Sequence, residues 1–113
     1  MMKGLFLRRV YSEAKPTGCT ITVTGTGDAT SCYLIINGVK AQSAGTYTVP
    51  VGDTIECTVK STSSSYQSYI KLNGNYEERG SNVTLTYDYE VAKNATINLT
   101  TSYAGGRITI TEG

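Results

Sequence analysis

The sequence predicts an all-β protein, folded as a single antiparallel β-sandwich, and three observations predict it. Thr and Tyr, which favour half-buried pleated strands, are abundant, with nine Tyr among 113 residues. Apolar and polar residues alternate over several short stretches. Asn-Gly, the pair that suits the tightest hairpin turns, occurs twice between strand-like runs. The length is that of one domain.

Strict alternation is clearest in three stretches: "CTITVT" (19–24), "TIECTV" (54–59) and "VTLTYDYEV" (83–91). Successive side chains of a strand point to opposite faces, so each stretch has one apolar and one polar face. In the third stretch Val83, Tyr87 and Tyr89 fall on the apolar face. Further strands are expected at 32–36, 39–43, 69–72, 95–101 and 107–111. The core is expected to include Ile21, Val23, Leu34, Ile36, Ile55, Val59, Leu72, Leu85, Tyr87, Ile97, Leu99 and Ile108.

The turns follow from local chemistry. Asn37-Gly38 and Asn73-Gly74 each predict a type I′ hairpin, because both central residues of that turn need a positive φ. "TGTGDAT" (24–30) lacks the Lys and the following helix of a phosphate-binding loop, so we interpret it as a β-turn. The Ser-rich segment 60–68 predicts a flexible loop.

The chain divides into an N-terminal arm, 1–16, and a β-sandwich domain, 17–113. The arm is basic and amphipathic, and its apolar side chains are numerous enough to require burial. They would dock on a neighbouring subunit or fold back over the chain's own sandwich as an extra strand. The candidate partner-binding residues of the arm are Leu5, Phe6, Leu7, Arg8, Arg9, Val10 and Tyr11.

Composition excludes several functions. A net charge of +1 gives no bulk field that would select nucleic acid or an acidic membrane. The sequence has no His, and its three Cys lack Cys-x-x-Cys spacing, so neither a zinc site nor a metal or other cofactor is expected. Cys19 and Cys57 share faces with aliphatic residues and are expected to be buried, reduced and inert. The carboxylates that can be placed fall on outward strand faces. We therefore expect no enzymatic activity.

Localisation can be argued from the N-terminus and the cysteines. The apolar run at 5–7 is too short for a signal peptide, and an odd number of Cys fits a disulfide framework poorly. These features favour folding in a reducing cytoplasm.

Tyrosines provide the second group of candidate site residues. Tyr66, Tyr69 and Tyr76 lie near predicted strand ends or loops, where their rings could stack on sugars, bases or a partner protein. The alternative is ordinary sheet composition. We therefore treat these three residues as candidate ligand-binding residues.

Several segments together resemble a known class of proteins. These are "FLRRVYSE" (6–13), "TITVTGTGDATSCYLIINGVK" (20–40), "VPVGDTIECTV" (49–59) and the terminal "GRITITEG" (106–113). They resemble small immunoglobulin-like β-sandwich proteins of tailed phages and prophages. The pattern of Cys, Trp and Cys that marks true immunoglobulin domains is absent, because the chain has no Trp.

The resemblance implies a phage virion structural protein, either a tail subunit or a head-decoration subunit, made in the bacterial cytoplasm. Its expected partners are other virion proteins, in a homo-oligomer or a larger assembly, with no nucleic acid and no membrane. The alternative is a module that binds carbohydrate or another host-surface ligand through exposed tyrosines.

Overall fold

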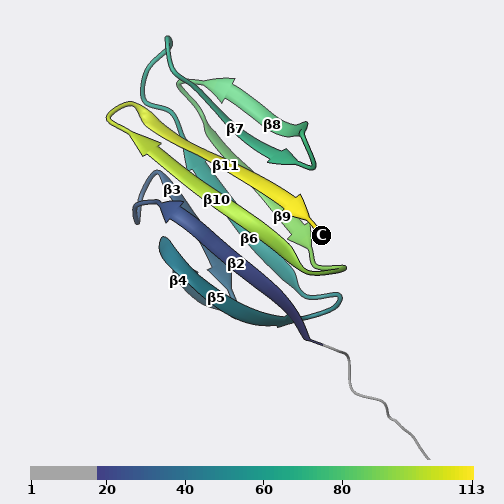
Figure 1. Cartoon of the computed structure of the whole chain (residues 1–113). Helices are drawn as coiled ribbons and strands as arrows, with labels where there is room; N and C mark the ends of the chain where they lie inside the picture. Colours follow the sequence, from purple (N-terminus) through teal and green to yellow (C-terminus); the bar gives the residue numbers. More distant parts are fainter. Residues whose placement is uncertain (1–17) are drawn as a thin grey trace, which may run out of the picture.

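Ten strands form two facing β-sheets in residues 18–113, the part of the chain that the computed structural model describes (Figure 1). These residues include no helix that is long and apolar enough to cross a membrane. The strands are β2 (Gly18–Thr26), β3 (Cys32–Ile36), β4 (Val39–Ala41), β5 (Ser43–Pro50), β6 (Thr54–Lys60), β7 (Gln67–Leu72), β8 (Asn75–Ser81), β9 (Thr84–Glu90), β10 (Ala95–Ser102) and β11 (Gly105–Glu112).

The larger sheet has the order β5-β2-β10-β11-β7-β8, and the smaller has the order β4-β3-β6-β9. The two sheets confirm the predicted all-β sandwich. The expectation that it is antiparallel throughout is wrong, because β10 pairs with β2 in parallel and β11 pairs with β7 in parallel. The β10–β11 hairpin lies between β2 and β7, whose directions the earlier chain has already set. Strand β10 of this hairpin therefore runs parallel to β2, and strand β11 runs parallel to β7.

Both Asn-Gly hairpins occur where the sequence predicts them. Asn37 and Gly38 have φ values of 52° and 79°, and they join β3 to β4. Asn73 and Gly74 have φ values of 53° and 86°, and they join β7 to β8. Positive φ at both central positions is the signature of a type I′ turn. The second of these turns sets the register of the candidate site described below.

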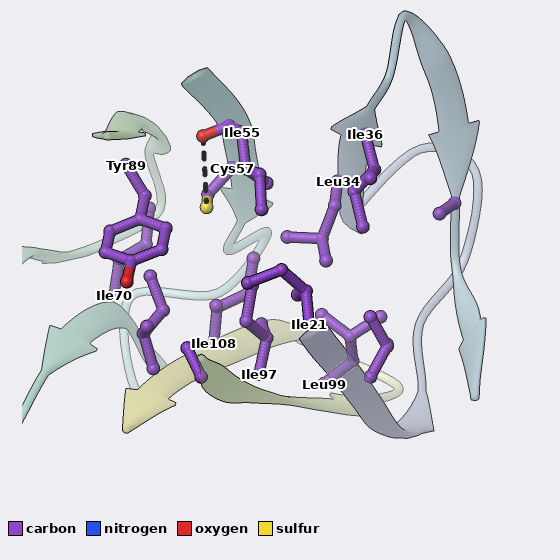
Figure 2. Close-up of a cluster of buried hydrophobic side chains, with 14 of the residues drawn as sticks. Ile21, Leu34, Ile36, Ile55, Cys57, Ile70, Tyr89, Ile97, Leu99 and Ile108 are labelled. Atoms are coloured by element: carbon purple, nitrogen blue, oxygen red, sulfur yellow. Dashed lines mark hydrogen bonds between the residues drawn. The ribbon is translucent and has the colours of Figure 1, made fainter. Parts of the chain in front are cut away.

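The core lies between the two sheets (Figure 2). All of the predicted core residues are buried except Leu72 and Tyr87, which are half-buried at its margin. Cys19, Cys57, Tyr89 and Val91, which the sequence placed on apolar strand faces, are buried in the core as well. The core also holds residues absent from the prediction: Cys32, Ala41, Val49, Ile70, Ala95 and Ile110. Val83, expected on the apolar face, is instead 40% exposed, because it precedes the first residue of β9.

Strand β8 is the second strand of the predicted Asn73-Gly74 hairpin, but no bounds for it were predicted from the sequence. Its residues are charged or polar for the most part, and all except Gly80 are exposed. It forms one end of the larger sheet and pairs only with β7 among the described strands. A strand with so little buried surface gives no alternating apolar signal. Its position nevertheless brings two side chains of the candidate site, Tyr76 and Arg79, beside β7.

Candidate ligand-binding face

Tyr69 and Tyr76 gather on the outer face of the larger sheet because of strand alternation and hairpin register. On β7, Ser68 and Ile70 point into the core, so Tyr69 and Lys71 point outward. The Asn73-Gly74 turn pairs Lys71 with Tyr76 across the hairpin. The register of the β7–β8 pairing shifts between Ile70 and Lys71. The next pair of residues along the hairpin therefore also has both side chains on the outer face.

That next outward pair is Tyr69 with Arg79. The rings of Tyr69 and Tyr76 meet edge to face, with centroids 5.4 Å apart and planes at 82°. This is a favourable arrangement for two aromatic quadrupoles. Two of the predicted ligand-binding tyrosines are therefore in direct contact.

Tyr66 reaches the same face from the loop before β7. Ser61, which is buried, donates its hydroxyl proton to the carbonyl oxygen of Tyr66 at 2.6 Å. The backbone N–H of Asn82 in turn donates to Ser61 Oγ at 3.1 Å. The segment that the sequence predicts as a flexible loop is thus tied to the body by a buried hydroxyl, which positions the Tyr66 backbone.

Arg107 links Tyr66 to Tyr69. The parallel pairing of β11 with β7 places Arg107 beside Tyr69, and Arg107 Nε donates to the carbonyl oxygen of Gln67 at 2.9 Å. Its guanidinium carbon lies 4.5 Å from the centroid of the Tyr66 ring and 5.2 Å from that of Tyr69. Both distances fall within the range of cation–π attraction. One guanidinium is therefore shared by two rings.

Two more cations complete the group. The Lys71 ammonium lies 5.0 Å from the centroid of Tyr69 and 4.7 Å from that of Tyr76. The Arg79 guanidinium lies 4.5 Å from the centroid of Tyr76. We call Tyr66, Tyr69, Tyr76, Lys71, Arg79 and Arg107 the tyrosine–cation cluster. Within it, every ring contacts at least one cation.

The chemistry of the tyrosine–cation cluster suits binding. Phenol rings offer apolar edges and hydroxyl groups, while Lys and Arg offer positive charge and several hydrogen-bond donors. These groups lie on the face of a sheet, and no pocket is found among residues 18–113. The described residues also contain no group of acidic, His or Cys side chains that could hold a metal ion.

The sequence predicted the three tyrosines but missed the three cations. Lys71 and Arg79 could have been found from strand alternation and from the register that the Asn73-Gly74 turn imposes. Arg107 could not, because the parallel pairing that brings it to Tyr69 joins distant segments. The predicted arm residues Leu5, Phe6, Leu7, Arg8, Arg9, Val10 and Tyr11 lie outside the described residues.

Other tyrosines have different surroundings. Tyr47 packs partly against the core, and Tyr89 is buried in it. Tyr103 is fully exposed at the β10–β11 turn. Tyr33, on the outer face of the smaller sheet, has the Lys40 ammonium 4.3 Å from its ring centroid. This isolated tyrosine–lysine pair provides a control for mutations in the tyrosine–cation cluster.

Cys19 and Cys57 are buried as predicted, Cys32 is buried as well, and all three are free thiols. Desolvation by burial raises the pKa of Cys57 to about 12, and that of Cys32 to about 11. Cys57 Sγ donates to the carbonyl oxygen of Ile55 at 3.8 Å, within its own strand (Figure 2). Since the thiolate is the reactive form of cysteine, Cys57 is held in its inert state and fills core volume.

Three carboxylates lie on the outer face of the smaller sheet, where the sequence places them. Glu56 on β6 stands directly opposite Asp88 on β9, and Glu90 is two pairs further along, opposite Thr54. All three side chains are exposed. The outer face of the smaller sheet thus carries these three carboxylates together with Lys40 and Lys60, whereas the outer face of the larger sheet carries the tyrosine–cation cluster.

Comparisons with protein-family models, curated proteins and solved structures found no match to this chain. The fold and the tyrosine–cation cluster thus define a β-sandwich domain with an aromatic, positively charged face.

Proposed function

We propose that the protein is a non-enzymatic binding module that holds carbohydrate or another host-surface ligand on its tyrosine–cation cluster. The observation that carries the proposal is the convergence of Tyr66, Tyr69 and Tyr76 on one open face, each in contact with a cation. Aromatic side chains with two torsions present large contact areas at low entropic cost, and Tyr and Arg are common at binding hot spots.

Retention of the purified protein on host-cell and polysaccharide surfaces tests the proposal. Tyr76 is 45% exposed, so Tyr76→Ala removes contact area without opening the core. We expect it to weaken retention by at least fivefold, the loss typical of a residue that contributes about 1 kcal/mol. Tyr33→Ala is the matched control, because it removes another tyrosine in contact with a lysine, from the opposite sheet. Equal losses in both variants would contradict the proposal.

A second candidate function is that of a phage virion structural protein, as a tail or head-decoration subunit. The segments "FLRRVYSE" and "VPVGDTIECTV", which resemble small phage immunoglobulin-like proteins, favour it. In this proposal the arm docks on another virion protein or on a second copy of the chain. The subunit is made in the host cytoplasm and ends in the particle.

Mass spectrometry of purified phage particles tests this candidate, which requires the protein at high copy number. Deleting residues 1–15 then tests the arm. An assembly arm predicts a truncated body that keeps its melting temperature but does not join the particle. A body that unfolds on truncation would instead make the arm part of the core and would contradict docking on a neighbour.

A further inference from the structure

Positive charge is concentrated at one end of the larger sheet. Arg107 and Arg79 flank Tyr69 in register on its two neighbouring strands, so their Cα atoms are about 10 Å apart. Lys71 lies two residues further along β7, about 7 Å from Tyr69. Three cations therefore surround one tyrosine on an open surface.

Overall charge does not explain this concentration. Residues 18–113 contain six Lys and Arg against eight Asp and Glu, a difference of −2. Most of the acidic groups lie on other strands and turns. Glu56, Asp88 and Glu90 occupy the other sheet, and Glu112 accepts hydrogen bonds from Asn73 and Tyr89.

Glu77 and Glu78 lie on β8 directly before Arg79. Glu78 pairs with Ile70, whose side chain points into the core, so strand alternation places Glu78 on the face opposite to Arg79. The outward neighbours of the cations on β10 and β11 are instead threonines, Thr100 and Thr109. The cluster thus presents net positive charge to whatever contacts it.

The rings are also already in contact with these cations. Tyr76 has both Lys71 and Arg79 within 5 Å of its centroid, and Arg107 lies against Tyr66 and Tyr69. A neutral sugar that stacks on a ring face competes with these cations. An anionic group is attracted to the same cations and leaves the cation–π contacts in place.

We propose that the ligand of this face is an acidic polysaccharide, a chain of sugars that bear carboxylate groups. The inference rests on the proposed carbohydrate-binding function and specifies its ligand class. Charge complementarity supplies the selection: Arg pairs with carboxylates in two-pronged geometry, while Lys71 acts as a point charge between the rings. The phenol hydroxyls and ring edges contact the sugar backbone.

The probe pair is polygalacturonate and its fully methyl-esterified form, which share a backbone and differ in charge. We expect binding to polygalacturonate that is at least tenfold tighter than to the ester and weakens from 50 mM to 500 mM salt. Lys71→Gln with Arg79→Gln should lose at least tenfold in affinity. Lys40→Gln with Lys93→Gln, which removes equal charge elsewhere, should bind like the wild type.

Each contrary result has a distinct meaning. Equal binding of both forms, or binding of neutral glycans only, overturns the acidic ligand class and leaves the carbohydrate-binding function standing. Binding to neither form and to no neutral glycan overturns both. Single-stranded DNA that binds as tightly as polygalacturonate makes the face a general polyanion site. The protein could also self-associate in a salt-sensitive way that the double variant Lys71→Gln with Arg79→Gln abolishes. That result would make a second copy of the chain the occupant of this face. Either result overturns the inference.

Discussion

The hydroxyl of Tyr89 donates to Glu112 Oε2 at 2.8 Å, which joins strand β9 of the smaller sheet to strand β11 of the larger. The ring of Tyr89 is buried in the core, whereas the carboxylate lies near solvent. Asn73 donates to the other oxygen of the same carboxylate at 3.0 Å. These two hydrogen bonds, that from Asn73 first, hold the pKa of Glu112 below its usual value.

Tyr89→Phe tests this link between the sheets. Removing the hydroxyl keeps the buried ring and deletes one hydrogen bond to a solvent-screened charge, so we expect a loss of about 1 kcal/mol in the free energy of unfolding. The pKa of Glu112 is lowered in the folded state, so its contribution is present above its unfolded pKa and lost as pH falls. Urea unfolding at pH 7 and pH 3 should show a smaller difference between variant and wild type at pH 3. An equal difference at both pH values would contradict the assignment.

The β2–β3 turn should show its own acid sensitivity. Asp28 Oδ1 accepts hydrogen bonds from the backbone N–H groups of Ser31 and Thr30, at 2.6 Å and 2.9 Å, and Oδ2 accepts one from the Ser31 hydroxyl. These bonds, that from the Ser31 hydroxyl first, lower the pKa of Asp28 to about 2.

The stabilisation by Asp28 is thus complete above pH 4 and lost as pH falls toward 2. Asp28→Ala should lose about 1–2 kcal/mol at pH 7, because the turn donors lose their acceptor. It should also flatten the stability profile between pH 4 and 2. Thermal unfolding of both proteins across that range checks this, and parallel profiles would contradict it.

Thiol labelling tests the burial of the cysteines. With a pKa of about 12, Cys57 is thiolate in about one molecule in 10⁴ at pH 8, and its side chain is 1% exposed. We expect little labelling of the native protein and three reactive thiols after denaturation. Rapid labelling of Cys57 in the folded state would show a reactive role that this structure does not support.

Ser68 offers an unusual stability test. Its side chain is fully buried on the inward face of β7, and its hydroxyl has no hydrogen-bond partner among residues 18–113. Because an unsatisfied buried hydroxyl is costly, Ser68→Ala should raise the free energy of unfolding by about 1 kcal/mol.

Ser61→Ala is the matched control, since Ser61 is buried with its hydroxyl bonded to Tyr66 and Asn82. It should lower the free energy of unfolding by about 1–2 kcal/mol. Chemical denaturation of both variants checks the contrast. Destabilisation by Ser68→Ala would indicate a partner for the Ser68 hydroxyl that the described residues do not contain.

The sequence predicted those features that depend on local chemistry. Alternation located most of the core, and Asn37-Gly38 and Asn73-Gly74 located two hairpins, because strand period and turn conformation are encoded by neighbouring residues. The parallel pairings of β2 with β10 and of β7 with β11 have no such local signal. The proximity of Arg107 to Tyr69 could therefore not be predicted, although the sequence identified Tyr66, Tyr69 and Tyr76 as candidate ligand-binding residues.

The central claim, that the tyrosine–cation cluster is a binding face, is tested most directly by mapping backbone amide chemical shifts during titration with polygalacturonate. The account predicts that the largest changes fall on β7, β8 and the start of β11, around Tyr69, Tyr76 and Arg107. The outer face of the smaller sheet, around Tyr33 and Glu56, should be unchanged. Changes centred on the smaller sheet, or no changes at millimolar sugar, would contradict the claim.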